Sequence, residues 1–139
     1  MFKEDVVTFW FEEIESKMWW ASDPSFDEQI RKRFLPILEQ AAAGELFAWR
    51  KDALGRLAEV IVLDQFSRNI HRGTPQAFSQ DAMALALSQE AVTAGALREL
   101  GVDQRSFLLM PYMHSESRQI HEHAEVLFRE HASGNNLKF

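Results

Sequence analysis

The stretch AEVIVLDQFSRNIHRG, residues 58–73, decides the fold class of this chain. Its first half is apolar on every side of a helix, which predicts that a helix from about Leu54 to Phe66 lies at the centre of the protein. Its second half is polar and contains Asp64, Gln65, Arg68, Asn69, His71 and Arg72. Such groups are costly to bury unless each finds a partner. We therefore expect either a helix end that reaches the surface or a polar network held within the fold.

The other apolar residues recur at the spacing of a helix and show no long alternation of the kind that indicates a strand. This pattern predicts further helices over residues 2–14, 26–44, 75–94, 103–110 and 115–131. No Gly/Ser-rich linker separates them. The sequence therefore predicts a single all-α domain over residues 1–139, built from helical pairs.

Local signals set the expected ends of these helices. Ser25 with Glu28 predicts a capping box at the start of the second helix. Pro111 predicts the end of the helix that begins near Asp103, because proline cannot donate to the preceding turn. Ser115 is the expected N-cap of the last helix.

Composition and charge narrow the classes of function. The formal net charge of −6 disfavours a nucleic-acid partner. The chain has no Cys, which excludes disulfides and thiolate metal sites and fits a cytoplasmic location. No apolar run approaches the roughly 20 residues of a membrane span, and the N-terminal stretch MFKEDVVTFWFEEIE carries acids that a secretory signal lacks. We expect no membrane partner, and the sequence does not specify an oligomeric state.

A second polar motif, MPYMHSE, spans residues 110–116. Helix-end roles account for Ser115 and for Glu116, but they leave His114 unexplained. Because both polar motifs lie at helix ends in an apolar setting, we expect Asp64 or Arg68 within hydrogen-bond or one-water reach of His114 or Glu116. Asp64 and Arg68 are also spaced to form an ion pair along one helix.

Two further groups of residues have simple interpretations. Trp19 and Trp20 either close the core or wall a pocket, and aromatic residues more often serve the core. The histidines near the C-terminus do not form a metalloprotease motif, and Arg118 shares their helix face and would repel a cation. We therefore expect neither a metal site nor a cofactor.

The motifs FWF (residues 9–11), WWASDPSFDEQIRKRF (19–34), LDQFSRNIHRGTPQAF (63–78) and LLMPYMHSES (108–117) resemble, in the same order, those of the bacterial domain-of-unknown-function 924 family. The resemblance covers essentially the whole chain, and Ser67 stands where proline is common in the family. It implies antiparallel helical hairpins packed as a tetratricopeptide-repeat-like array, and it brings no established reaction or catalytic residues. Similar proteins usually continue with a segment of the type RFGRFPHRN, so we expect the chain to lack a C-terminal segment usual in similar proteins.

These observations predict a binding module for a small anionic metabolite or a peptide, because Arg68 and Arg72 offer forked donors that suit a carboxylate or a phosphate. One alternative is a hydrolase or lyase that uses His114 with Asp64 or Glu116 as acid and base. Another is a structural scaffold whose polar residues serve only as caps and ion pairs. The candidate ligand-binding residues are Asp64, Gln65, Arg68, Asn69, Arg72, His114, Ser115, Glu116, Trp19 and Trp20.

Overall fold

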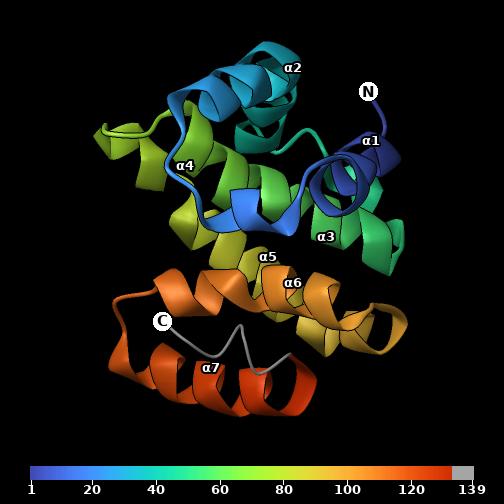
Figure 1. Cartoon of the computed structure of the whole chain (residues 1–139). Helices are drawn as coiled ribbons and strands as arrows, with labels where there is room; N and C mark the ends of the chain where they lie inside the picture. Colours follow the sequence, from blue (N-terminus) through green and yellow to red (C-terminus); the bar gives the residue numbers. More distant parts are fainter. Residues whose placement is uncertain (133–139) are drawn as a thin grey trace.

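The computed structural model, which describes residues 1–132, is helical, and no β-strand occurs in that range (Figure 1). The all-α class is therefore confirmed. The α-helices are α1 (Lys3–Thr8), α2 (Pro24–Ala42), α3 (Ala53–Ile61), α4 (Ser67–Ile70), α5 (Asp81–Thr93), α6 (Val102–His114) and α7 (Arg118–His131). Short π or 3₁₀ turns join them at η1 (Phe9–Glu13), η2 (Ser16–Trp20), η3 (Phe47–Lys51), η4 (Val62–Phe66), η5 (Pro75–Phe78) and η6 (Ala96–Glu99). None of the helices in the described range is long and apolar enough to cross a membrane.

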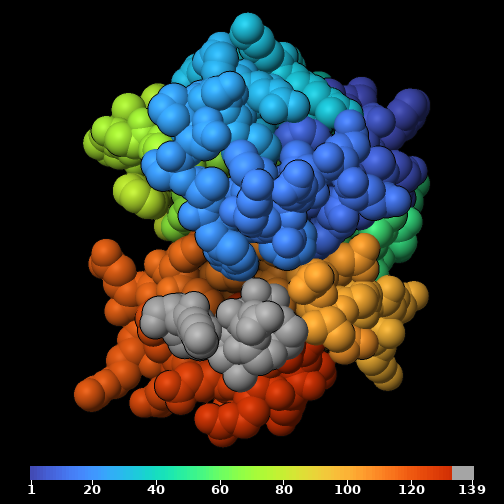
Figure 2. Space-filling view, viewed as in Figure 1, coloured from blue at the N-terminus to red at the C-terminus, as the bar shows by residue number. Residues whose placement is uncertain are grey.

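The helices form two halves that meet along α3 and α5 (Figure 1). In the N-terminal half α1 packs on α3 and α2 packs on α4, whereas in the C-terminal half α5, α6 and α7 pack in sequence. The seam between the N-terminal half, in blue, and α6 and α7, in orange and red, crosses the face shown in Figure 2. This arrangement is compatible with stacked helical hairpins, and a tetratricopeptide-like array stays a prediction.

A continuous helical path from Ala53 to Ile70, made of α3, η4 and α4, lies at the centre of the fold. Every residue from 57 to 67 is buried, which confirms the prediction of a central helix. The path extends past Phe66 because residues 62–66 form a π-type turn rather than a helix end. Such turns hold an extra residue and occur often at functional sites. Here the turn contains the buried polar pair Asp64 and Gln65.

Phe66, at the end of the π turn, anchors this path in a cluster of aromatic side chains. Its ring centroid lies 4.7 Å from that of Phe34, 5.8 Å from that of Trp10 and 6.1 Å from that of Phe9. All four residues are almost fully buried. The polar residues on either side of Phe66 are therefore fixed to the core, because aromatic packing of this kind leaves little freedom to the backbone that carries it.

The start of α2 differs from the prediction. The helix begins at Pro24 and its N-cap is Asp23, whose Oδ1 accepts hydrogen bonds from the amides of Ser25 (2.9 Å) and Phe26 (3.2 Å). The predicted capping box of Ser25 and Glu28 is wrong, because aspartate followed by proline at the first helical position supplies a better start.

The boundary between α6 and α7 also lies elsewhere than predicted. Pro111 is inside α6, which continues to His114, because the burial of residues 106–113 outweighs the loss of one backbone hydrogen bond. The N-cap of α7 is Ser117, whose Oγ accepts from the amide of Ile120, and not Ser115. Ser115 and Glu116 therefore lie in the connection between the two helices.

Gly55 allows η3 to pack directly on α3, and we expect Gly55→Ala to destabilise the protein by about 1–3 kcal/mol, the usual cost of overpacking. A Cβ atom at position 55 would lie 1.8 Å from the carbonyl oxygen of Trp49, so the backbone of η3 would have to move. Urea unfolding measures the change. Gly101→Ala is the matched control, because its Cβ would meet only the Gln104 Oε1 atom, at 3.7 Å. Equal unfolding midpoints for the two variants would contradict this packing.

Candidate functional site

The fully buried carboxylate of Asp64, in the π turn, is the centre of a polar cluster. Its Oδ2 accepts a hydrogen bond from Gln65 Nε2 (2.9 Å), and its Oδ1 accepts from Arg68 Nη1 (3.1 Å) and from His114 Nδ1 (2.8 Å). The expected ion pair of Asp64 with Arg68 and the expected contact with His114 are thus both present. A buried carboxylate with several donors is well satisfied, and it holds each donor side chain in place.

Arg68 connects this carboxylate to α5. Its guanidinium forms a bidentate pair with Asp81, with Nη1 2.9 Å from Oδ1 and Nη2 3.0 Å from Oδ2, and Nη1 also donates to the Asp64 carbonyl oxygen (2.9 Å). The Cζ atom lies 5.3 Å from the ring centroid of Phe78, a cation–π distance. Arg68 is therefore held by residues of three segments and cannot swing freely toward a ligand.

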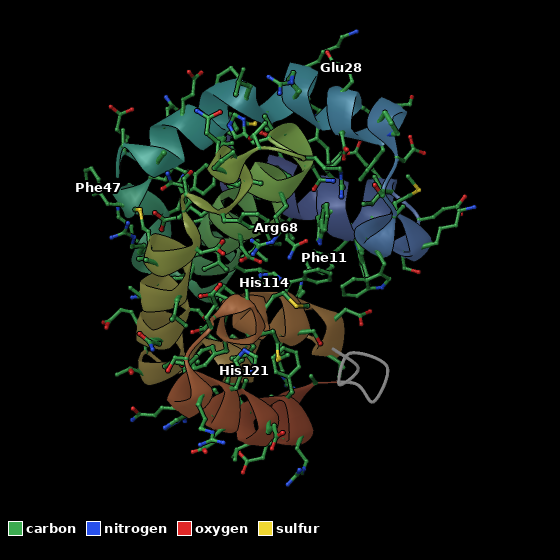
Figure 3. The ribbon with its side chains drawn as sticks, turned by 90° about the vertical axis from the view of Figure 1, so that its left-hand side faces the viewer. Phe11, Glu28, Phe47, Arg68, His114 and His121 are labelled. Atoms are coloured by element: carbon green, nitrogen blue, oxygen red, sulfur yellow. The ribbon has the colours of Figure 1, made fainter. Side chains whose placement is uncertain are left out.

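The imidazole of His114, at the end of α6, completes the cluster from the other half of the fold. Figure 3 shows Arg68 and His114 pointing toward one another where the two halves meet. Because the Asp64 carboxylate accepts from Nδ1, this nitrogen carries a proton and Nε2 is the other functional atom of the ring. Among residues 1–132, no hydrogen bond occupies Nε2. The turn after His114 is fixed by His121, whose Nε2 donates to the Ser115 carbonyl oxygen.

A second carboxylate, Asp27 of α2, organises the neighbouring residues of the motif. It accepts hydrogen bonds from Asn69 Nδ2 (2.9 Å) and from Arg72 Nε (2.6 Å) and Nη2 (3.2 Å). The hydrogen bond with Asp27 raises the pKa of Arg72 above its ordinary value, although partial burial opposes this, so the guanidinium stays charged. Arg72 Nη1 has no partner within the described residues.

A cleft of about 190 Å³ lies between the two motifs; we call it the donor cleft. Its walls carry hydrogen-bond donors and aromatic rings, and no carboxylate lines it. The carboxylates of Asp27 and Asp64 lie behind these walls and hold the donors. The lining residues are Trp19, Trp20, Ala21, Gln65, Arg68, Asn69, Arg72 and His114.

A larger groove of about 660 Å³ adjoins the donor cleft, since Arg68 and His114 line both; we call it the acidic groove. It differs from the cleft in charge, because the carboxylates of Asp81 and Glu116 reach it. Glu116 is exposed and has no ion-pair partner in the described part of the chain. The remaining lining residues are Phe78, Ala82, Leu85, Pro111 and Ser115.

Trp19 and Trp20 pack against the core and also line the donor cleft. Closing the core and walling a pocket are therefore not exclusive alternatives for these residues. Both pack edge-on or stacked against Phe107, with ring centroids 4.8 and 5.7 Å from it. Trp19 Nε1 donates to the Trp10 carbonyl oxygen (2.9 Å), which fixes its ring. Trp20 is 58% exposed, a large value for tryptophan, and it lines the donor cleft.

The structure brings the predicted residues together with one difference of position. Asp64 lines neither space and instead holds the residues that do, because it is fully buried beneath them. Asp27, Phe78 and Asp81 complete the cluster and are not among the predicted ligand-binding residues. Asp27 lies within the motif WWASDPSFDEQIRKRF, and Asp81 lies three residues after LDQFSRNIHRGTPQAF. Their place within or next to the matching motifs was the signal available. In residues 1–132, no group of three or more His, Asp or Glu side chains is arranged to hold a metal ion.

Comparisons with known proteins concern the chain as a whole. The family model of bacterial proteins of unknown function DUF924 matches residues 6–138. The solved structure of the protein of unknown function ATU0120 from Agrobacterium tumefaciens is similar to this chain with a TM-score of 0.91 and 31% sequence identity, covering 97% of this chain and 76% of that chain. The comparison with curated proteins found no match. The likeness therefore extends from the motifs to the whole helical fold.

Proposed function

Because this chain belongs to the DUF924 family of bacterial proteins of unknown function, we propose its function from its own side chains: it binds a small anionic metabolite or a peptide through a carboxylate. The observation that carries this proposal is the lining of the donor cleft. Arg68, Arg72 and His114 face a space that no carboxylate lines. Charge-assisted hydrogen bonds from such donors are the strong ones in anion recognition.

The site is also preorganised, which supports binding over a merely structural role. Asp64 and Asp27 hold the donor side chains by hydrogen bonds of 2.6 to 3.2 Å, so little conformational entropy remains to be lost when a ligand enters. Trp19 and Trp20 supply flat apolar walls at low entropy cost. The cleft thus combines aromatic walls with several convergent polar groups, and small-molecule sites use such polar groups to fix the orientation of a ligand.

The proposed setting of this protein is the cytoplasm, with neither nucleic acid nor membrane as a partner. The net charge of −6 and the absence of Cys support that setting.

Arg72→Gln is expected to weaken the binding of a simple alkanoate such as pentanoate by about 10–100-fold, the loss that follows from one or two charge-assisted hydrogen bonds. Isothermal titration calorimetry measures the affinity. The fold should persist, because the Arg72 side chain is 41% exposed and Asp27 keeps its hydrogen bond from Asn69 in the variant.

Arg33→Gln is the control for this experiment, since Arg33 pairs with Glu13 away from the cleft and is similarly exposed. It should leave the affinity unchanged. If no alkanoate binds the unaltered protein, or if both variants bind equally well, the proposed function is wrong and the scaffold alternative is favoured.

A second candidate function, a hydrolase or lyase, is favoured by the Asp64–His114 pair. A buried carboxylate that orients Nδ1 leaves Nε2 to accept a proton, as in acid–base catalysis. A carboxylate held by the arginines would place the neighbouring carbon near this nitrogen. Nuclear magnetic resonance in D₂O tests the idea: protein-dependent exchange of that carbon's hydrogen, lost in His114→Gln, supports catalysis, and its absence for all ligands that bind excludes this chemistry.

A further inference from the structure

We propose that the ligand is a zwitterion whose carboxylate occupies the donor cleft and whose ammonium group occupies the acidic groove, an inference that rests on the proposed function. The two spaces are contiguous, since Arg68 and His114 form part of the wall of each. A ligand that enters one space therefore has direct access to the other.

The charges around the groove select a cation there. Two carboxylates, those of Asp81 and Glu116, line the groove, whereas Arg68 is the one guanidinium in its lining among residues 1–132. Asp64 lies behind the wall that the groove shares with the donor cleft. The lining therefore has an excess of negative charge when His114 is neutral. An ammonium group in the groove would offset this negative charge, whereas a second anionic group of the ligand would be repelled there.

The groove also has unused interactions of the kind that an ammonium group makes. The carboxylate of Glu116 is exposed and has no ion-pair partner among residues 1–132, whereas Asp81 already pairs with Arg68. The aromatic ring of Phe78 is 60% exposed at the same groove and can add a cation–π contact. Glu116 is thus the residue that we expect to distinguish a zwitterion from a plain anion.

Part of the wall of the acidic groove is apolar. Ala82, Leu85 and Pro111 line the groove beside His114. Methylene groups or a short peptide backbone would contact these side chains. An amino-acid-like metabolite and a short peptide share one feature: a short chain separates a carboxylate from an ammonium group. A ligand with this feature could place one charged group in each of the two spaces.

The test compares probes that differ by one charged group. Calorimetry is performed on the whole chain with 5-aminopentanoate, pentanoate and pentylamine, and with the shorter and longer members of each series. We expect the best aminoalkanoate to bind about tenfold tighter than the matching alkanoate, the gain from one partly exposed charge pair. Glycylglycine, which has the same number of atoms between its charged groups as 5-aminopentanoate, distinguishes the sources: tighter binding indicates a peptide and weaker binding an amino-acid-like metabolite.

Glu116→Gln assigns the ammonium site. In this variant the aminoalkanoate should lose its advantage, whereas the affinity for the alkanoate should not fall. Glu122→Gln, which removes an exposed carboxylate of α7 outside the groove, is the control and should keep the advantage. Both variants change only an exposed side chain, so both should fold.

The outcomes separate this inference from the proposed function. If alkanoates bind but the amino group adds nothing, or if the advantage survives in Glu116→Gln, the zwitterion is wrong and the carboxylate site stands. If pentylamine binds as tightly as 5-aminopentanoate, the carboxylate contributes nothing and the proposed function itself is overturned.

Discussion

Asp64→Ala should lower the free energy of unfolding by about 2–5 kcal/mol, the range for removing one partner of a buried ion pair. The carboxylate is fully buried and accepts hydrogen bonds from Gln65, Arg68 and His114. Its removal leaves Gln65 and His114 without this acceptor, takes one of several acceptors from Arg68 and opens space in the central helix. Urea unfolding followed by circular dichroism measures the change.

Two further variants check the interpretation of that result. Asp103→Ala, at an exposed aspartate in the first turn of α6, should change stability by at most about 0.5 kcal/mol. The double variant Asp64→Ala with Arg68→Ala should lose less than the sum of the single variants, because the two residues share one interaction. If Asp64→Ala unfolds like Asp103→Ala, then Asp64 does not organise the cluster.

Phe66→Ala is the second large effect that we expect, with a loss of about 3–5 kcal/mol, the usual cost of deleting a fully buried aromatic ring. Phe66 packs against Phe9, Trp10 and Phe34 and carries the π turn on its N-terminal side. The variant should therefore also disturb the hydrogen bonds of Asp64. Thermal unfolding and the near-UV circular dichroism of the tryptophans report the two effects.

Phe47→Ala is the control of the same residue type, because Phe47, in η3, is 67% exposed, and Figure 3 shows it at the edge of the molecule, away from Arg68. It should cost less than about 0.5 kcal/mol. Similar losses for Phe47→Ala and Phe66→Ala would show that the aromatic cluster does not anchor the π turn.

The central helix and the all-α class could be predicted because residues 57–63 are apolar on nearly all sides of a helix, with Glu59 as the one charged residue. The π turn at residues 62–66 could not be predicted, since its residues are also good members of an ordinary helix. Pro111 misled the sequence analysis for a related reason: tertiary burial of α6 outweighed a local signal.

Most residues of the candidate site could be predicted from the sequence, but most of the hydrogen bonds and ion pairs between them could not. The contact between His114 and Asp64 was expected because two polar motifs at helix ends must find partners within the fold. Asp27 and Asp81 were missed as partners because acidic residues at the start of a helix are common for local reasons, through the helix dipole, and nothing local indicates a distant arginine. The donor cleft and the acidic groove differ because carboxylates line the groove and not the cleft. This difference depends on the three-dimensional fold and could not be predicted from the sequence.

The most direct test of the central claim, that the donor cleft binds a carboxylate, is a titration followed through the tryptophan indole N–H resonances. When pentanoate or 5-aminopentanoate is added, we expect the resonance of Trp20, at the cleft, to shift until the site is saturated. The resonance of Trp49, in η3, should stay unchanged. The Trp20 shift should require a much higher ligand concentration in Arg72→Gln. If the Trp20 resonance does not move with either ligand, or if Trp20 and Trp49 shift equally, the donor cleft does not bind a carboxylate.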